Sequence, residues 1–266
     1  MRLKDKVAIV VGAGQSPGEG IGNGRATALL FAREGAKVTA VDRTLAAAQE
    51  TVALIGGEGG EAAAAEADIT DEAAVKAMVE AVLARHGRID ILHNNVGISV
   101  GGGDASVTEI TEGAFDLITA VNLRGMVVTC KHVLPAMRRQ QSGVIVNISS
   151  IAAISSFPNV AYKTSKAGVI ALTEQLAYEN AQYGVRANVI LPGLMDTPMA
   201  VDTRARLWNK PRAEIVAERD AKVPLRGKMG TGWDVAYAAL FLASDEANFV
   251  TGVALPVDGG ASVRRG

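Results

Sequence analysis

Tyr162 and Lys166 are the two residues whose types and spacing most directly suggest chemistry. They stand four apart in the segment AYKTSK, which is predicted to be helical, so their side chains share one face of the helix. A free tyrosine, with a pKa of about 10, is a poor base at neutral pH. An ammonium group roughly 5 Å away, at an effective dielectric constant of about 20, favours the phenolate by about 3 kcal/mol, or some two pKa units. The pair could then exchange a proton with a bound oxygen.

Three polar residues upstream could complete such a site. Ser149 and Ser150 end the apolar run VIVNISS, where a hydroxyl could hold the same oxygen, and Asn122 lies in a long segment predicted to be helical. Taken singly, each has an ordinary explanation. Tyr-x-x-x-Lys often arises by chance in helices, serines cap strand ends, and an asparagine in a helix usually bonds to backbone or solvent. Their joint order along the chain, with suitable elements between them, favours a functional site.

A glycine-rich stretch, VVGAGQSPGEGIGNGRATALLFAREG, joins the first predicted strand to the first predicted helix. Glycines let backbone amides approach a pyrophosphate, and the helix N-terminus adds a positive dipole end. The strict G-x-G-x-x-G pattern is absent. The looser G-x-x-x-G-x-G occurs twice, as Gly14/Gly18/Gly20 and Gly18/Gly22/Gly24. Alone, this pattern is also compatible with a flexible connection.

The next predicted strand supports a dinucleotide site. It ends in Asp42, which follows Gly24 at close to the roughly 20-residue offset of the acid that hydrogen-bonds an adenosine ribose. A carboxylate there would also repel a 2′-phosphate, whereas the neighbouring Arg43 could accept one. Asp42 could instead be a turn residue before the helix at Leu45. We expect NAD, with NADP as the less favoured cofactor.

Strands and helices alternate along most of the chain. The predicted strands are 6–12, 37–42, 61–68, 89–95, 143–149, 186–193 and 252–260, and the predicted helices are 24–35, 45–57, 71–87, 113–140, 161–184 and 233–244. This order predicts an α/β fold with a doubly wound parallel sheet of the Rossmann type, about seven strands with helices on both faces. No linker or repeat divides residues 1–266, so we expect one domain, in which the least regular segment, residues 195–232, forms a substrate lid.

Bulk properties exclude several classes of function. The 266 residues carry a net charge of −1, which argues against a nucleic-acid partner. No uncharged apolar window reaches 18 residues and the N-terminus lacks a signal-peptide pattern, so we expect no membrane span and a cytoplasmic protein. The single cysteine, Cys130, is predicted to be core packing. His86, His93 and His132 have no metal-ligand spacing, so we expect no catalytic metal.

Taken together, these motifs resemble the short-chain dehydrogenase/reductase family in its single-domain form. The resemblance runs from about Lys6 to Gly260 and includes the glycine turn, NNVG at 94–97, VNL at 121–123, the serine, Tyr-x-x-x-Lys and PG at 192–193. It implies catalytic roles for Tyr162, Lys166 and the serine, with Asn122 fixing a helix distortion and a water that relays protons to Lys166. The family position is Ser150 when counted along the strand and Ser149 when counted back from Tyr162. We choose Ser150, because hydrogen bonding fixes the end of the strand.

The resemblance also implies which residues bind the cofactor. They are Gly12, Gly22, Asn23, Gly24, Asp42, Asp68, Ile69, Asn95, Val96, Gly97, Tyr162, Lys166, Pro192, Gly193, Met195 and Thr197. Two features depart from the family pattern. Val96 replaces the usual alanine, and the glycine turn is six residues longer, with the insertion at about 15–20. The extra glycines are expected to let the longer loop fold back without blocking the phosphates.

The expected function is that of an NAD-dependent oxidoreductase that interconverts a secondary alcohol and a ketone by hydride transfer, with tyrosine as general acid and base. One alternative is an NADPH-dependent 3-oxoacyl thioester reductase, against which Asp42 argues. Another is a non-catalytic dinucleotide-binding sensor, against which the presence of both Tyr162 and Lys166 argues. The predicted lid contains apolar residues and arginines, including Arg204, Arg206 and Arg212, so a cyclic or aromatic alcohol, with or without a carboxylate, is compatible with it.

Two long helices, around 116–138 and 162–183, are apolar on more than one face. In the first, Leu117, Val121, Met126, Val127 and Val133 extend nearly all round the helix. Only one side can pack on the sheet, so a second surface should cover the outer side. The resemblance implies a dimer through such helices, doubled to a tetramer near 255–260. We therefore expect a homo-oligomer, with a tetramer favoured over a dimer.

Overall fold

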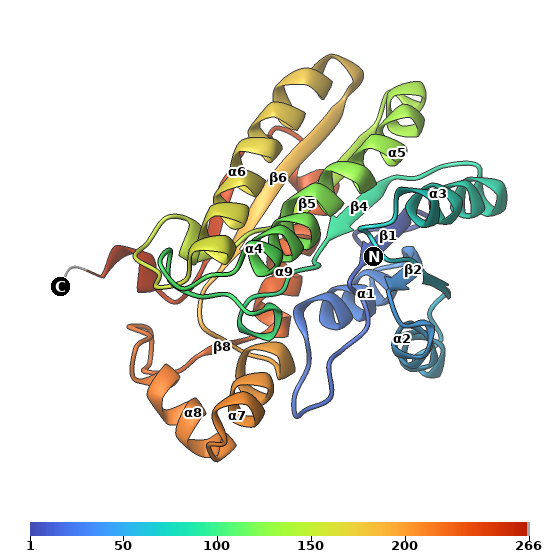
Figure 1. The fold of residues 1–266 in the computed structure, drawn as a ribbon. Helices are drawn as coiled ribbons and strands as arrows, with labels where there is room; N and C mark the ends of the chain where they lie inside the picture. Colours follow the sequence, from blue (N-terminus) through green and yellow to red (C-terminus); the bar gives the residue numbers. More distant parts are fainter. Residues whose placement is uncertain (265–266) are drawn as a thin grey trace.

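Seven parallel strands form the central sheet of the protein, whose computed structural model describes residues 1–264 (Figure 1). Their spatial order is β3–β2–β1–β4–β5–β6–β9, so the order of addition reverses between β1 and β4. The strands are β1 (Val7–Val11), β2 (Lys37–Asp42), β3 (Ala62–Glu66), β4 (Ile91–Asn94), β5 (Gly143–Ile148), β6 (Val185–Pro192) and β9 (Ala254–Val257). The predicted doubly wound, Rossmann-type sheet is confirmed. Ligands of such sheets bind beyond the carboxyl ends of the strands, at the reversal point.

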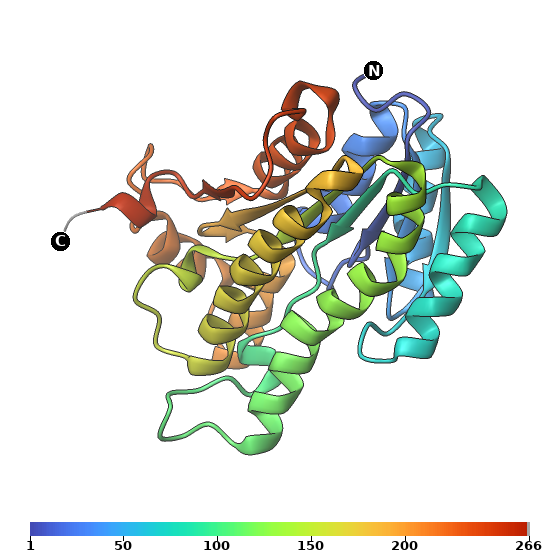
Figure 2. The same cartoon turned by 90° about the horizontal axis from the view of Figure 1, so that it is seen from above.

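Helices cover both faces of the sheet, as the view from above shows (Figure 2). One face carries α1 (Asn23–Arg33), α2 (Leu45–Gly57) and α9 (Gly232–Ala243), and the other carries α3 (Glu72–His86), α5 (Gly125–Gln140) and α6 (Val160–Asn180). Strand β1 alternates between the two resulting cores, with Ala8 and Val10 facing one and Ile9 facing the other. A strand buried on both faces must be apolar at every position, which explains the run VAIVV.

Local signals set several helix ends where the sequence predicts them. Helix α3 begins at Asp71, whose carboxylate accepts hydrogen bonds from the amides of Ala73 and Ala74, and ends at Gly87 with φ +71°. Strand β3 has no such local support, because alanine favours helix. It forms because residues 62–66 pair in parallel with residues 38–42 at the edge of the sheet.

The predicted helix at 113–140 is interrupted in the middle. It consists of α4 (Glu112–Thr119), a π-helical turn η2 (Ala120–Arg124) and α5. Residues 112–140 are long and apolar enough to cross a membrane by length and composition, with a mean hydropathy of 1.2. The mean hydropathy applies to the most apolar window within these residues, and half of that window is buried inside the protein. Cys130 of α5 is buried as predicted, and burial raises the pKa of its thiol to about 12.

Residues 195–231 form a separate layer at the carboxyl edge of the sheet, shown in orange at the bottom of Figure 1. Two short strands, β7 (Met195–Asp196) and β8 (Gly230–Thr231), pair at its base. Between them lie a π-helical turn η5 (Pro198–Asp202), α7 (Thr203–Trp208) and α8 (Arg212–Asp220). The sequence analysis treats this segment as irregular and misses both helices. They are held by a small core of their own, formed by Val201, Ile215, Val223 and Met229. We refer to residues 195–231 as the lid.

Candidate active site

Helix α6 presents Tyr162 and Lys166 at the carboxyl edge of the sheet. Its first turn is held by Asp104, whose carboxylate accepts hydrogen bonds from the amides of Ala161 (3.0 Å) and Tyr162 (3.2 Å). A carboxylate at this position also complements the helix dipole. One turn later, the Nζ of Lys166 lies 5.8 Å from the centre of the Tyr162 ring, so the predicted shared face is present. The sequence analysis does not single out Asp104, because a contact across 57 residues leaves no local pattern.

Lys166 is buried, with only 2% of its surface exposed. Its Nζ donates to the carbonyl oxygens of Ile148 (2.9 Å) and Val96 (3.5 Å), at the ends of neighbouring strands. No carboxylate within residues 1–264 forms an ion pair with it. Burial therefore lowers the pKa of the Lys166 ammonium to about 7. The lysine can change its protonation state near neutral pH.

The pKa of Tyr162 is raised rather than lowered, so the expected effect of Lys166 on the phenol is wrong for the protein by itself. Burial raises the tyrosine pKa most, and a hydrogen bond with Ser150 and the charges of Arg204 and Arg219 lower it in part. The reason is that burial of the phenol itself outweighs the groups that favour the phenolate. The protein alone thus keeps the phenol protonated at neutral pH, the state that can donate a proton.

The two serines at the end of β5 have different partners. Ser149 is 2% exposed, and its hydroxyl donates to the carbonyl oxygen of Lys166 at 2.7 Å. The hydroxyl of Ser150 accepts from the amide of Ala152 at 3.1 Å and acts on the phenol of Tyr162, whose pKa it lowers. Of the two, the structure brings Ser150 to the tyrosine.

Asn122 lies within the π-helical turn and is fully buried. Its Oδ1 accepts from the amide of Ile98 (2.8 Å), and its Nδ2 donates to the Ile98 carbonyl (2.9 Å) and to the Ser165 hydroxyl (3.1 Å). The helix is therefore distorted at Asn122, as the resemblance implies, because the amide bonds to the chain after β4. A Cβ on Gly97 would lie 3.0 Å from the Lys166 Nζ and 3.5 Å from the Asn122 Oδ1, so both polar groups converge there.

The turn after β1 is suited to a phosphate group. Gly12 has φ +76°, and a Cβ on Gly24 would overlap the carbonyl oxygen of Gly12, so α1 begins directly against the turn. Gly22 precedes α1 without a capping side chain, which leaves the first amides of the helix for an anion. Within residues 1–264 the buried Oδ1 of Asn23 also has no hydrogen-bond partner. These features fit the pyrophosphate and sugar of a dinucleotide.

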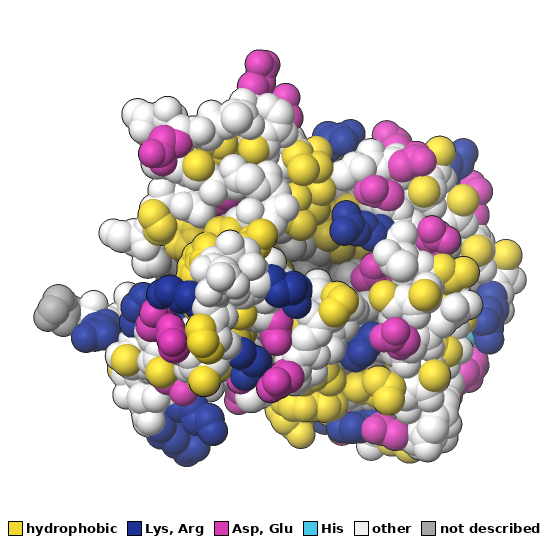
Figure 3. Space-filling view, turned by 60° about the horizontal axis from the view of Figure 1, so that its bottom comes forward, with side chains coloured by type: hydrophobic (Ala, Val, Ile, Leu, Met, Phe, Trp, Pro, Cys, Tyr) yellow, Lys and Arg dark blue, Asp and Glu magenta, His cyan; other side chains and the backbone are white. Residues whose placement is uncertain are grey.

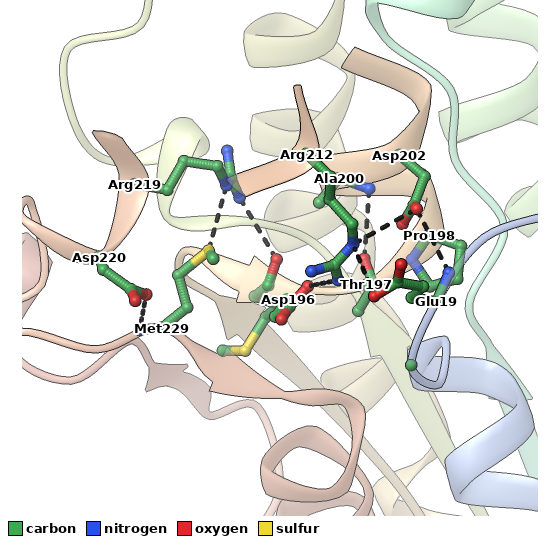
Figure 4. Close-up of polar contacts among 12 residues, drawn as sticks. Glu19, Asp196, Thr197, Pro198, Ala200, Asp202, Arg212, Arg219, Asp220 and Met229 are labelled. Atoms are coloured by element: carbon green, nitrogen blue, oxygen red, sulfur yellow. Dashed lines mark hydrogen bonds and ion pairs between the residues drawn. The ribbon is translucent and has the colours of Figure 1, made fainter. Parts of the chain in front are cut away.

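The six-residue insertion folds away from this turn. Gln15 closes the insertion, donating to the Gly20 carbonyl (3.2 Å) and accepting from the Gly22 amide (2.9 Å). Its tip reaches the lid, where the Glu19 amide donates to Asp202 (3.3 Å) and the Glu19 carboxylate lies 3.6 Å from Arg212 (Figure 4). The insertion thus joins the cofactor turn to the lid, a contact that the sequence analysis does not anticipate.

Asp42 ends β2 beside the glycine turn. Its carboxylate accepts from the amides of Gly14 (3.1 Å) and Thr44 (3.2 Å). It is partly exposed, so its oxygens remain accessible to a ribose hydroxyl. The neighbouring Arg43 is exposed. A hydrogen bond from Thr70 lowers the pKa of Asp68 most, and the charge of Arg43 adds to this effect.

The remaining predicted cofactor residues lie along the same edge of the sheet. The Nδ2 of Asn95 donates to the Gly12 carbonyl (3.2 Å), and Val96 packs against Gly12. Ile69 is 4% exposed and packs on α5, so its side chain belongs to the core. After Pro192, the amide of Gly193 donates to the Val257 carbonyl. In the lid, Met195 is buried and the Thr197 hydroxyl caps the next turn, accepting from the Ala200 amide (3.3 Å).

The space-filling view brings this edge of the molecule forward (Figure 3). The surface is hollowed near its centre, hydrophobic side chains line the hollow, and Lys and Arg side chains gather around it. Across residues 1–264, no three His, Cys, Asp or Glu side chains are grouped so that they could hold a metal ion.

Comparison with known proteins agrees with this geometry. The profile of the family described as enoyl-(acyl carrier protein) reductase matches residues 17–262. The 3-oxoacyl-[acyl-carrier-protein] reductase of Thermotoga maritima is 38% identical over 261 residues, covering 98% of this chain and 99% of the relative. The 2-(R)-hydroxypropyl-CoM dehydrogenase of Xanthobacter autotrophicus is 38% identical over 257 residues, covering 96% and 97%.

A solved structure from Burkholderia xenovorans, described as a short-chain dehydrogenase/reductase, superposes with a TM-score of 0.90 at 44% identity, covering 100% of this chain and 99% of that one. The chain belongs to the short-chain dehydrogenase/reductase family. It is an oxidoreductase that interconverts alcohols and ketones, and its family uses a nicotinamide dinucleotide as cofactor. This conclusion confirms the expected fold, family and reaction type.

Proposed function

We propose that the protein is an NAD-dependent oxidoreductase that interconverts a secondary alcohol and a ketone, with Tyr162 exchanging the proton. The observation that carries the proposal is the convergence of Ser150, Tyr162 and Lys166. The Ser150 hydroxyl lowers the pKa of the phenol, and the Lys166 Nζ lies 5.8 Å from the centre of the tyrosine ring. When bound, the nicotinamide dinucleotide supplies or accepts the hydride.

Each protein group has a role that follows from its contacts. Tyr162, protonated in the free protein, donates its proton to a ketone oxygen. In the direction of alcohol oxidation the phenol first passes its proton to Lys166 and then, as the phenolate, takes the proton of the alcohol. Ser150 holds the same oxygen through its hydroxyl. Lys166, with a pKa of about 7, passes protons between the tyrosine and the region of Gly97. Asn122 positions this region through its bonds to Ile98, and the same amide is placed to hold the relay water.

The choice of NAD is supported by Asp42. Its carboxylate stands at the end of β2, where it would accept from the ribose hydroxyls and repel a 2′-phosphate. A second candidate function, reduction of a 3-oxoacyl thioester with NADPH, is favoured by the identity with the Thermotoga maritima relative. Turnover of a 3-oxoacyl thioester with NADPH, compared with turnover of secondary alcohols with NAD, separates the two.

A homotetramer, with a dimer as the smaller alternative, is supported by the outer side of α4, α5 and α6. Met126 and Val133 are buried against the sheet, whereas Leu117 is 49% and Val127 42% exposed. Tyr178 of α6 is also exposed. Apolar residues at the surface of long helices commonly mark a protein interface. We place the protein in the cytoplasm, in keeping with its single cysteine.

The test of the proposed function is Tyr162→Phe, assayed with a panel of secondary alcohols and ketones and both dinucleotides. We expect the variant to keep its circular dichroism and its cofactor binding, and to lose turnover at least about 100-fold, because the proton exchange is lost. Tyr237→Phe, on the exposed side of α9, is the matched control and should turn over like the parent. Turnover of Tyr162→Phe within a few-fold of the parent would refute the role of Tyr162.

A further inference from the structure

Two arginines of the lid carry positive charges that act on the phenol of Tyr162. Arg204 comes from α7 and Arg219 from α8, and the positive charge of each lowers the pKa of the tyrosine. Both guanidinium groups are partly buried, and burial lowers the pKa of Arg204 and that of Arg219, the latter to about 10. The field of the lid arginines therefore reaches Tyr162.

Neither arginine is satisfied by the protein. Arg204 donates to the Ala200 carbonyl (2.8 Å), and its Cζ lies 5.8 Å from the centre of the Trp208 ring. Within residues 1–264, Arg219 donates from Nε to the Met229 sulfur (3.2 Å) and from Nη2 to the Met195 carbonyl (3.4 Å) (Figure 4). Since a guanidinium has five N–H donors, most of the donors remain free.

Within residues 1–264, no carboxylate forms an ion pair with Arg204 or Arg219. The nearest acids that act on Arg219 are already engaged. Asp196 pairs with Arg212, and Asp220 accepts from the Met229 amide (2.8 Å). They raise the pKa of Arg219, but burial and the charge of Arg204 outweigh them.

Arg212, in the same lid, is surrounded by carboxylates, although its Nε has no hydrogen-bond partner within residues 1–264. It lies 2.5 Å from Asp196, 3.4 Å from Asp202 and 3.6 Å from Glu19. Two partly buried cations without counter-ions are electrostatically unfavourable, and the cost is reduced when an anion binds between them. The contrast indicates that Arg204 and Arg219 are kept unpaired for a ligand.

We propose that Arg204 and Arg219 bind a carboxylate of the substrate, so that the enzyme acts on a hydroxy acid and the corresponding oxo acid. The planar fork of a guanidinium matches the two oxygens of a carboxylate. The substrate would then be held at two points, its reacting oxygen at Tyr162 and Ser150 and its carboxylate at the lid. This inference rests on the proposed function, because it places the carboxylate relative to the reacting oxygen.

The test compares acids with their methyl esters. The panel is 3-hydroxybutyrate, mandelate and 4-hydroxycyclohexanecarboxylate, each with its methyl ester, assayed with NAD for the parent, Arg204→Gln and Arg219→Gln. We expect the parent to prefer at least one acid over its ester. Each variant should raise KM for that acid at least about tenfold, as for the loss of a charge-assisted hydrogen bond, and change KM for the ester by less than about threefold. Arg226→Gln, at an exposed position of the lid, is the control and should change neither.

Several results would overturn the inference. It is wrong if the parent prefers the ester in all three pairs, or if the arginine variants affect acid and ester alike. Oxidation of neutral secondary alcohols with no preference for acids would reject the inference and leave the proposed function intact. If neither these compounds nor the wider panel of secondary alcohols and ketones is turned over with NAD or NADP, the proposed function fails. Calorimetric titration of the three oxo acids in the presence of NADH then decides the inference, because binding that is lost in Arg219→Gln supports it and absence of binding rejects it.

Discussion

Replacing Lys166 by methionine should stabilise the folded protein at neutral pH while abolishing activity. The folded-state pKa of this lysine is about 7, compared with an ordinary value of 10.5. Because the folded state disfavours the proton, the unfolded chain binds more protons between pH 10.5 and 7, and stability falls as pH is lowered through that range. Above pH 10.5, Lys166 is neutral in both the folded and the unfolded protein, so it does not lower the stability of the fold.

The size of the effect follows from the two pKa values. The penalty of charging Lys166 amounts to about 1 kcal/mol at pH 9.5 and about 4 kcal/mol at pH 7, so it grows by about 3 kcal/mol between them. Methionine removes this penalty but also removes the bonds to the Ile148 and Val96 carbonyls, which costs about 1–3 kcal/mol. The loss of these two hydrogen bonds does not depend on pH. The change with pH in the difference in free energy of unfolding between variant and parent therefore measures the ionisation of Lys166.

The assay is urea unfolding of the parent and Lys166→Met at pH 9.5 and pH 7, at one protein concentration and with no dinucleotide added. We expect the free energy of unfolding of the variant, relative to the parent, to rise by about 3 kcal/mol as pH falls from 9.5 to 7. Lys76→Met is the control, because the Lys76 side chain is 61% exposed on α3, and its difference from the parent should not depend on pH. A difference for Lys166→Met that is the same at both pH values would refute the depressed pKa and the proton-relay role built on it.

Three further results are expected. Asp42→Asn keeps an acceptor for the Gly14 amide but removes the negative charge. It should lower the preference for NAD over NADP, measured as the ratio of the two kcat/KM values, at least about tenfold. A parent that already prefers NADP would contradict our interpretation of Asp42. Ser150→Ala should lower kcat at least about tenfold, because its hydroxyl acts on the phenol of Tyr162, whereas Ser149→Ala should chiefly lower stability, since its hydroxyl donates to the Lys166 carbonyl; the reverse pattern in kinetics and thermal unfolding would exchange their roles. Light scattering at micromolar concentration should give the mass of four chains of 27.5 kDa each, or of two for a dimer, and Leu117→Glu should reduce it; a mass of 27.5 kDa for the parent would reject the oligomer.

Much of the fold follows from local patterns in the sequence. The buried strands are continuous apolar runs, so VAIVV and KVTAVD identify β1 and β2 within a residue or so. Asp71 and Gly87 end α3 through bonds and backbone angles that involve only near neighbours. The spacing of Tyr162 and Lys166 likewise places both on one face of α6, because the helical repeat is a local property. The family, the sheet and the reaction type could therefore be predicted.

Other features depend on groups that are far apart in the chain, and only the tertiary structure decides them. The π-helical turn at Asn122 is stabilised by hydrogen bonds to Ile98, and the first turn of α6 by Asp104. Burial lowers the pKa of Lys166 and, separately, raises that of Tyr162, which is the opposite of what the spacing of the two residues alone suggests for the tyrosine. Whether a lid arginine is paired, like Arg212, or free, like Arg219, depends on which acids the fold brings within reach. Sequence spacing determines which side chains share an element, whereas burial and long-range contacts determine their charge, their partners and hence their chemistry.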